Sequence, residues 1–238
     1  EKDGGLIRIE YPGNWHSLVI ARREALKAIL PGTTRMNAPL HAEKPLPGSA
    51  STSHAVEGPE KIAADYASYL RDESRLSGGK AARLFFPENE AEIAAFLSEM
   101  NARGLPVTVS GGRTGIVGGA VPRSGGLLSL EKMDRILALG RDPATGEWFV
   151  RAQPGILLKA LHRAIEAKDP AALPPGAARE EFLASSARFF YPVDATETSA
   201  TLGGTIAANA SGERSYRYGP TRKQVRALRV VLADGGVL

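Results

Sequence analysis

The chain of 238 residues contains no cysteine. This absence excludes disulfides, cysteine-ligated zinc and cysteine-ligated iron–sulfur clusters. The histidines are few and widely spaced, without an HxxH or HExxH pair, so we expect no intrinsic metal site. Long apolar runs are also missing, because no stretch approaches the roughly 18–20 residues of a membrane-spanning helix.

Neither sign of charge dominates. The formal net charge is +4, and the lysines and arginines are scattered without a long basic block. This pattern favours a soluble protein with some attraction for an anionic ligand, and we expect no nucleic-acid partner. The start of the chain lacks both an initiator Met and a signal-peptide pattern. We therefore expect a trimmed N-terminus and a cytoplasmic protein, with any membrane association made through a partner.

Residues 1–60 differ from the rest and are predicted to form an N-terminal appendage of a helix and an extended arm. Apolar residues near helical spacing predict the helix over 17–30, and its other face is basic. A basic face suits a membrane surface or a partner protein, although an ordinary solvated face explains it more simply. Residues 33–59 are rich in Pro, Ser, Gly and Ala, which indicates a linker or an extended arm.

Residues 61–238 are predicted to form one domain. After a helical stretch at 60–71, a strand at 84–86, a helix at 88–103 and a strand at 107–109 follow one another closely. Strand, helix and strand at this spacing make a βαβ unit with a parallel, right-handed crossover.

Downstream the sequence is rich in strands, with one clear helix at 155–165. The Pro- and Ala-rich residues 168–178 predict a surface insertion, which continues to about 187. Residues 234–236 predict a hairpin turn. Because the sequence stops just inside the returning strand, we expect a fragment of a longer protein. The strands predicted in this part are 127–130, 148–152 and 225–232.

The most informative stretch is a glycine-rich loop after the strand at 107–109. Two glycine pairs bracket Arg113 and Thr114, and backbone so poor in side chains lets N–H groups converge on an anion. The loop follows a parallel strand, where ligands bind in open α/β sheets. Its spacing is not GxGxxG and no helix-start signal follows, which argues against a classical NAD site. A P-loop is also excluded, because Lys80 is followed by Ala81.

A second segment of small residues spans 201–212 and contains a Gly-Gly pair, with Asp194 upstream. A packed core segment could have this composition. The adjacent glycines, an Asn and a flanking acid favour backbone that contacts a ligand. Two phosphate-compatible segments about a domain's width apart suggest one long cofactor that contains a diphosphate.

Short motifs occur in a fixed order along residues 69–238. With them, this part of the chain resembles the FAD-binding domain of the FAD-linked oxidase family, the vanillyl-alcohol oxidase and p-cresol methylhydroxylase type. The likeness is greatest to the branch of D-lactate dehydrogenase and glycolate oxidase flavoproteins. The motifs are YLRDESR at 69–75, FPENEAEI at 86–93, SGGRTG at 110–115, GGAVP at 118–122, YPVD at 191–194, ATLGG at 200–204, NASG at 209–212 and YG at 218–219.

The resemblance implies an α+β fold with a small parallel βαβ lobe and a larger, mostly antiparallel lobe that clasp FAD between them. Residues 111–115 would bind the FAD pyrophosphate through backbone N–H groups, with the charge of Arg113 beside it. Residues 192–194 and 201–212 would line the ribityl and isoalloxazine groups. The implied cofactor-binding residues are Ser110, Gly111, Gly112, Arg113, Thr114, Gly115, Gly118, Gly119, Pro192, Asp194, Ser199, Thr201, Gly203, Gly204, Asn209, Ser211 and Gly212.

Arg113 is also a departure from part of the family, because members with covalent flavin carry histidine there. Together with the absence of cysteine, this implies non-covalent FAD.

The implied activity is oxidation of a D-2-hydroxy acid of the lactate or glycolate type by hydride transfer to flavin N5. Electrons would then pass to an acceptor protein or a quinone. The family's catalytic base lies in a C-terminal cap domain that is absent here, so we name no catalytic residue. Two alternatives stay open. One is a flavin-binding module completed by a partner subunit or the missing domain, and the other is an NADPH-dependent reductase on the same fold.

Overall fold

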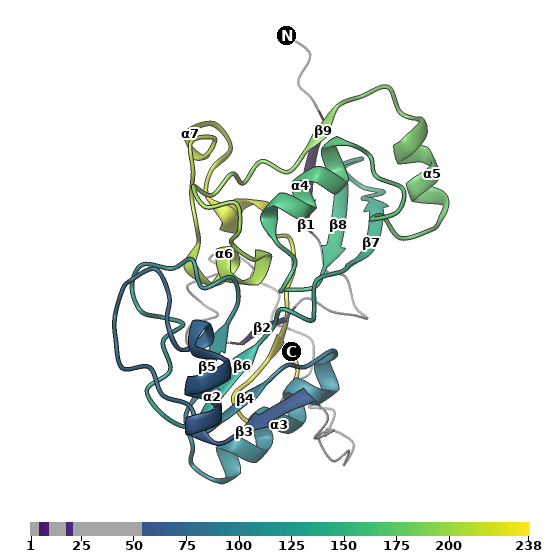
Figure 1. The fold of residues 1–238 in the computed structure, drawn as a ribbon. Helices are drawn as coiled ribbons and strands as arrows, with labels where there is room; N and C mark the ends of the chain where they lie inside the picture. The colour runs from purple at the N-terminus through teal and green to yellow at the C-terminus, as the bar shows by residue number, and fades with distance from the viewer. Residues whose placement is uncertain (1–4, 10–17, 21–53) are drawn as a thin grey trace. The chain divides into compact units, whose positions relative to one another are not determined.

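The structure is a computed structural model, which describes residues 5–9, 18–20 and 54–238. The chain divides into two compact units, and each is described by itself (Figure 1). Unit 2 comprises Leu18–Met133 and Val230–Leu238, and unit 1 comprises Glu1–Ser17 and Asp134–Arg229. No helix among the described residues is long and apolar enough to cross a membrane.

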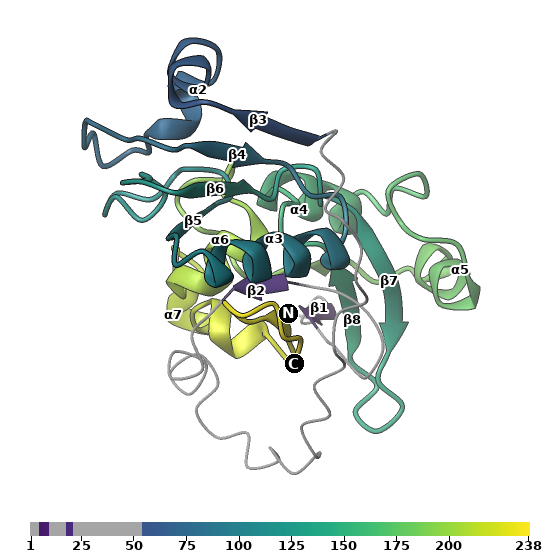
Figure 2. The same cartoon turned by 90° about the horizontal axis from the view of Figure 1, so that it is seen from below.

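Unit 2 is built on a four-stranded sheet with the order β3-β4-β6-β5 (Figure 2). Strand β3 (Ala55–Glu57) is antiparallel to β4 (Arg83–Phe85). Strands β4 and β5 (Val107–Ser110) both pair in parallel with β6 (Gly126–Ser129), which lies between them. The predicted parallel βαβ unit is therefore confirmed, with β6 inserted between its two strands.

Helix α3 (Glu90–Ala102) covers one face of this sheet. Its start is fixed by Asn89, whose side chain accepts a hydrogen bond from the N–H of Glu92 at 3.0 Å, as an N-cap does. Its apolar residues pack with side chains of the strands into one buried cluster, in which Phe85 and Phe96 stack at 5.0 Å. Alternation along the strands sends every second residue into this cluster and the others to the opposite face.

The opposite face is covered by α2 (Pro59–Asp65) and the short 3-10 helix η2 (Ala67–Leu70). Ile62 packs with Leu84 and Leu127 in a second buried cluster, which confirms the helical stretch predicted at 60–71.

The C-terminal end of the chain packs into unit 2. Strand β10 (Arg229–Val231) pairs with β2 (Leu18–Ile20), and Val231 forms an antiparallel bridge with Val237 across the predicted turn at 234–236. The strand is shorter than the predicted 225–232. Gly235 has φ +85° and lies so close to the carbonyl oxygen of Ala94 that a Cβ would be 2.6 Å away, so this turn requires glycine.

Unit 1 contains a second four-stranded sheet with the order β7-β8-β1-β9. Strand β7 (Ile136–Arg141) is antiparallel to β8 (Trp148–Ala152). Strand β1 (Gly5–Ile9) is parallel to both β8 and β9 (Phe189–Phe190). This sheet is mixed, where the sequence predicted a mostly antiparallel lobe.

Helices and turns flank this sheet (Figure 1). The structure begins α4 at Leu158, later than the predicted residue 155, because Pro154 and Gly155 precede it in a turn. The helices of unit 1 are α4 (Leu158–Glu166), α5 (Ala177–Ala184), α6 (Leu202–Ala208), α7 (Ser215–Tyr218) and the 3-10 helix η3 (Thr221–Gln224).

The segment predicted as a surface insertion at 168–187 has its own anchor in the core. Phe182 of α5 is fully buried, stacks on Phe189 at 4.5 Å and meets Trp148 edge-on at 5.3 Å. Leu173 is also buried. The Pro- and Ala-rich composition of the segment predicts surface exposure, but these two apolar side chains hold it to the core.

Two predictions for the N-terminal appendage need correction where the structure describes it. Leu18–Ile20 is a strand, so the helix predicted over 17–30 does not begin there, and the remainder of that range lies outside the described residues. Ala55–Glu57, at the end of the predicted linker 33–59, is a strand paired with β4. Strand pairing with distant residues explains both, because it is not encoded in local composition.

Candidate functional site

The glycine loop, residues 111–125, connects β5 to β6 in unit 2. Among the residues that the structure describes, none accepts a hydrogen bond from the backbone N–H groups of residues 111–117. The tip of the loop is open to solvent, with Ile116 77% and Val117 84% exposed. Unpaired, accessible N–H groups in one short stretch form a donor set suited to an anion with several oxygens.

The loop also leaves space for a ligand. A Cβ built on Gly115 or Gly119 would meet no heavy atom within 4 Å, so packing within the unit does not require glycine there. At Arg113 the backbone adopts the left-handed conformation, with φ +58°. That conformation is uncommon for residues other than glycine and gives the loop a sharp change of direction. The donor set and the open space fit the diphosphate of FAD.

The loop runs along a neighbouring segment, residues 69–82, which we call the strap. The N–H of Glu73 donates to the carbonyl oxygen of Arg113 at 3.3 Å, and the N–H of Ala120 donates to Oδ2 of Asp72 at 3.3 Å. Further along, the N–H of Lys80 donates to the carbonyl oxygen of Pro122 at 2.8 Å.

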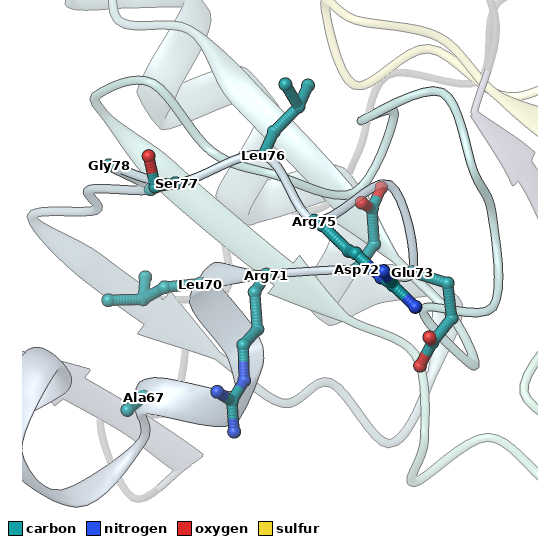
Figure 3. A pocket seen from close by; sticks show the side chains of 10 residues that line it. Ala67, Leu70, Arg71, Asp72, Glu73, Arg75, Leu76, Ser77 and Gly78 are labelled. Atoms are coloured by element: carbon teal, nitrogen blue, oxygen red, sulfur yellow. The ribbon is translucent and has the colours of Figure 1, made fainter.

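The strap also lines a pocket of about 620 Å³ with its residues from Leu70 to Gly79, and Ala67 just before the strap completes the lining. Figure 3 shows Arg71 and Leu76 leaving the strap in opposite directions, with Asp72 between them in the chain.

Arg113 does not extend freely into solvent. Its guanidinium lies over the ring of Tyr69, 4.3 Å from the centroid, and its Nη1 is 4.0 Å from Oε2 of Glu131. The side chain of Arg113 is 23% exposed. The stacking and the nearby carboxylate hold this charge beside the loop and partly compensate it.

Tyr69 joins the same cluster through its hydroxyl, which donates to the carboxylate of Glu131 at 2.8 Å. Burial, the hydrogen bond to Glu131 and the negative charge of Glu131 together raise the pKa of Tyr69 to about 12, against the opposing effect of Arg113. Tyr69 is therefore a neutral hydrogen-bond donor at physiological pH.

Ser110, expected to contact the cofactor, is fully buried at the end of β5. Its register partner on β6, Ser129, is equally buried, and neither hydroxyl has a hydrogen-bond partner. A ligand cannot reach either hydroxyl in this conformation, so the side chain of Ser110 lies beneath the loop rather than on its surface.

The second segment, predicted as backbone in a loop, is largely helical. Helix α6 begins after Thr201, whose hydroxyl accepts a hydrogen bond from the N–H of Gly204 at 3.3 Å. Gly203 packs against Pro154, where a Cβ would lie 2.7 Å from the proline Cβ. A Cβ on Gly212 would lie 1.7 Å from the carbonyl oxygen of Asp194. Close packing inside unit 1 therefore accounts for two of these glycines.

Several polar residues of this segment already have partners in unit 1. Oδ1 of Asp194 accepts from the N–H of Arg214 at 3.0 Å, and the hydroxyl of Ser199 donates to Glu197 at 2.6 Å. Asn209 ends α6 in the left-handed conformation, with φ +48°. Its Oδ1 accepts from the N–H of Arg222 at 3.1 Å. Pro192 is buried.

One side of α6 is nevertheless open. Gly204, Ala207 and Ala208 are exposed at helical spacing, and Ser211 is exposed just beyond the helix. Such small residues make a surface against which a flat group can lie closely. This side of α6 is the part of the second segment that can contact a cofactor.

His162 and two tyrosines have structural surroundings. Nε2 of His162 is 2.8 Å from the carbonyl oxygen of Val193, so the imidazole is held within unit 1. Tyr191 is fully buried and meets the ring of His162 edge-on. Tyr218 packs edge-on against Phe190.

Sequence reasoning assigned no role to Asp72 or Glu131, although both contact residues of the glycine loop or its cluster. For Asp72, the motif YLRDESR at 69–75 was the one feature of the sequence that could have indicated a role. Nothing local in the sequence joins Glu131 to Tyr69, because they are 62 positions apart.

Comparison with known proteins identifies the chain. The FAD binding domain family matches residues 81–181 and 171–238. The chain belongs to this FAD-binding family. The resemblance noted in the sequence is confirmed, and FAD is the cofactor, as expected. The predicted boundary between residues 60 and 61 stays a prediction.

The FAD-binding chain has curated relatives that are named as dehydrogenases and oxidases. A D-lactate dehydrogenase of Anaerostipes hadrus is 39% identical over 148 residues, which cover 62% of this chain and 26% of that protein. A D-2-hydroxyglutarate dehydrogenase of Xanthomonas citri is 37% identical over 177 residues, which cover 74% of this chain and 33% of that protein. A glycolate oxidase subunit of Bacillus subtilis is 32% identical over 154 residues, which cover 64% of this chain and 28% of that protein. The chain thus spans about a quarter to a third of their length.

Solved structures share the fold of this FAD-binding chain. The 6-hydroxy-D-nicotine oxidase of Arthrobacter nicotinovorans aligns with a TM-score of 0.56 at 17% identity, covering 81% of this chain and 37% of that one. The Bermuda grass isoallergen BG60 aligns with a TM-score of 0.56 at 20% identity, covering 78% and 35%. The predicted α+β fold class is confirmed.

The pKa of Tyr69 gives a test of the cluster around Arg113. We expect one tyrosine to ionise at about 12 rather than 10.0, and the Tyr69→Phe variant to lack that step when tyrosinate absorbance is followed against pH. Because the unfolded chain loses this proton near 10.0, the stabilisation from neutral Tyr69 is complete below that pH and is lost as the pH rises toward about 12. Loss of a step near 10 in Tyr69→Phe would contradict the burial and the bond to Glu131.

Proposed function

We propose that this chain is the FAD-binding part of an oxidoreductase that oxidises a D-2-hydroxy acid and holds FAD non-covalently. The observation that carries the proposal is the row of unpaired N–H groups at residues 111–117 in a chain of the FAD-binding family. When bound, FAD supplies the acceptor for a hydride from the substrate carbon. The protein supplies binding, orientation and charge.

The pyrophosphate would be bound by the N–H groups of the glycine loop. Each N–H that pairs with a phosphate oxygen makes a charge-assisted hydrogen bond, which is stronger than a neutral one. Arg113 adds positive charge at the same loop, where Tyr69 and Glu131 hold its guanidinium. Thr114 offers a hydroxyl next to it. Residues 111–119 are thus the proposed contacts of unit 2.

In unit 1, the exposed side of α6 is the proposed surface for the flavin end of the cofactor. Gly204, Ala207 and Ala208 present no long side chain there, so a planar ring system can approach the helix closely. Thr201, Asp194 and Asn209 would then act by fixing the shape of this segment through their bonds within the unit.

The substrate class rests on the relatives. Their names include D-lactate dehydrogenase, D-2-hydroxyglutarate dehydrogenase and glycolate oxidase subunit, which share 2-hydroxy acid chemistry. Such a substrate carries a carboxylate. Electrons would leave the flavin for an acceptor protein or a quinone. A second candidate function is a flavin-binding module that a partner subunit completes.

The first experiment is the visible absorption spectrum of the purified chain, before and after acid precipitation. We expect a flavin spectrum or uptake of added FAD, with the flavin released into the supernatant because no covalent bond holds it. Flavin that stays with the pellet would contradict non-covalent binding. A colourless protein that takes up no FAD would contradict the proposed site.

The second experiment separates the candidate activities. In a protein that carries this chain together with the C-terminal domain expected to supply the catalytic base, we expect D-lactate, D-2-hydroxyglutarate or glycolate to bleach the bound flavin under anaerobic conditions, while NADPH does not. Bleaching by NADPH alone would identify a reductase on the same fold. If neither the 2-hydroxy acids nor NADPH bleach the flavin, and a partner subunit restores activity, the chain is the flavin-binding module.

The charge of Arg113 can be tested by substitution. We expect Arg113→Ala to weaken FAD binding by about 1–3 kcal/mol, as for a lost charge-assisted contact. Arg123→Ala is the matched control, because Arg123 is an exposed arginine of the same loop without an ion pair among the described residues. Isothermal titration with FAD measures both. Equal affinity in Arg113→Ala and wild type would show that the loop N–H groups alone carry the pyrophosphate.

A further inference from the structure

We propose that Asp72 is a positioning residue of the FAD site, which holds the glycine loop in its binding shape without touching FAD. The inference rests on the proposed function of the loop. Asp72 lies on the strap and is only 8% exposed. As an ionised carboxylate it cannot donate a hydrogen bond to phosphate oxygens, so it is not one of the donors of the loop. A carboxylate repels a diphosphate, so its place beside this loop calls for another explanation.

The carboxylate of Asp72 joins two distant parts of the chain. Its Oδ2 accepts from the N–H of Ala120, at the far end of the stretch of unpaired donors, 48 positions away. Its Oδ1 accepts from the N–H of Ser74 at 3.0 Å and from the hydroxyl of Ser74. Both oxygens are therefore engaged, one with the strap and one with the loop.

The neighbouring residue holds the other end of the same stretch. The N–H of Glu73 donates to the carbonyl oxygen of Arg113 at 3.3 Å, and the guanidinium of Arg113 lies on the ring of Tyr69. Two consecutive strap residues thus hold the loop at Arg113 and at Ala120. Between these two points, the N–H groups of residues 114–117 have no acceptor among the described residues.

Packing supports the same arrangement. Leu76 of the strap lies against Gly118, where a Cβ would be 2.5 Å from the Leu76 Cδ1. Gly118 has φ +76°, a conformation that glycine adopts without strain. The strap therefore supports the loop beside Ala120 by contact as well as by the hydrogen bond to Asp72.

The ionisation of Asp72 suits a permanent acceptor. Burial raises its pKa, but the hydrogen bonds from Ser74 and Ala120 lower it by more, so the net pKa lies below the usual value for aspartate. The carboxylate consequently remains an acceptor at physiological pH. A loop held in advance loses less conformational freedom when it binds a ligand, and this gain appears as affinity.

The test compares Asp72→Ala and Asp72→Asn with Asp65→Asn. Asp65 is an exposed acid of unit 2 at the end of α2, without a hydrogen bond or ion pair among the described residues, so it controls for the change of charge. FAD dissociation constants come from titration of flavin fluorescence, and thermal unfolding is followed for each variant. Hydrogen exchange of the amides at residues 118–122 is measured in protein stripped of FAD.

We expect Asp72→Ala to weaken FAD binding about tenfold or more and to speed exchange at Ala120, because the loop loses its anchor. Asp72→Asn keeps a single carboxamide oxygen and can accept only on one side, so its affinity should lie between those of Asp72→Ala and wild type. Asp65→Asn should match wild type in both measurements. This graded order separates positioning from a general loss of stability.

The outcomes separate this inference from the proposed function. Wild-type protein that binds no FAD would overturn both. Wild-type protein that binds FAD, with unchanged affinity and exchange in the Asp72 variants, would overturn the inference alone. If Asp72→Ala does not fold, Ser74→Ala removes the hydroxyl that donates to Asp72 and accepts from the N–H of Leu76 at 3.2 Å, and it should weaken FAD binding about threefold. Unchanged affinity and exchange in Ser74→Ala and Asp72→Asn would likewise overturn the inference.

Discussion

The parallel pairing of β5 with β6 is the constraint on which the site of unit 2 depends. Neighbouring parallel strands need a connection that returns along the sheet, and a helix usually supplies it. Here the glycine loop makes the return without a helix, so the N–H groups of residues 111–117 find no acceptor within the loop. The strap supports this path with hydrogen bonds at Arg113, Ala120 and Pro122. What remains unpaired between them is the proposed binding surface.

The two units offer different kinds of surface. In unit 2 no described residue accepts from the backbone N–H groups of residues 111–117, and the nearby side chains of Tyr69, Glu131 and Arg113 bind one another. In unit 1 the backbone is largely bonded within α6, and an exposed side without long side chains is what remains for a ligand.

Much of unit 2 could be predicted from the sequence, because its signals are local. The apolar spacing of α3 and the β-branched run of β5 predicted the βαβ unit, and the glycine pairs predicted the loop. Helix α6 was missed for a physical reason. Two adjacent glycines are poor helix formers, and the close approach to Pro154 in the folded unit explains only the first of them, Gly203. The cluster of Tyr69 and Glu131 likewise depends on contacts far apart in the sequence.

The free N–H groups at residues 114–117 belong to the backbone, which every residue type except proline supplies equally. The identity of the side chains at this tip is therefore weakly constrained by the donor set, and Ile116 and Val117 point into solvent. The residues that shape the loop from the strap have no such freedom. The tip of the loop is therefore expected to tolerate changes of side chain that the supporting strap does not.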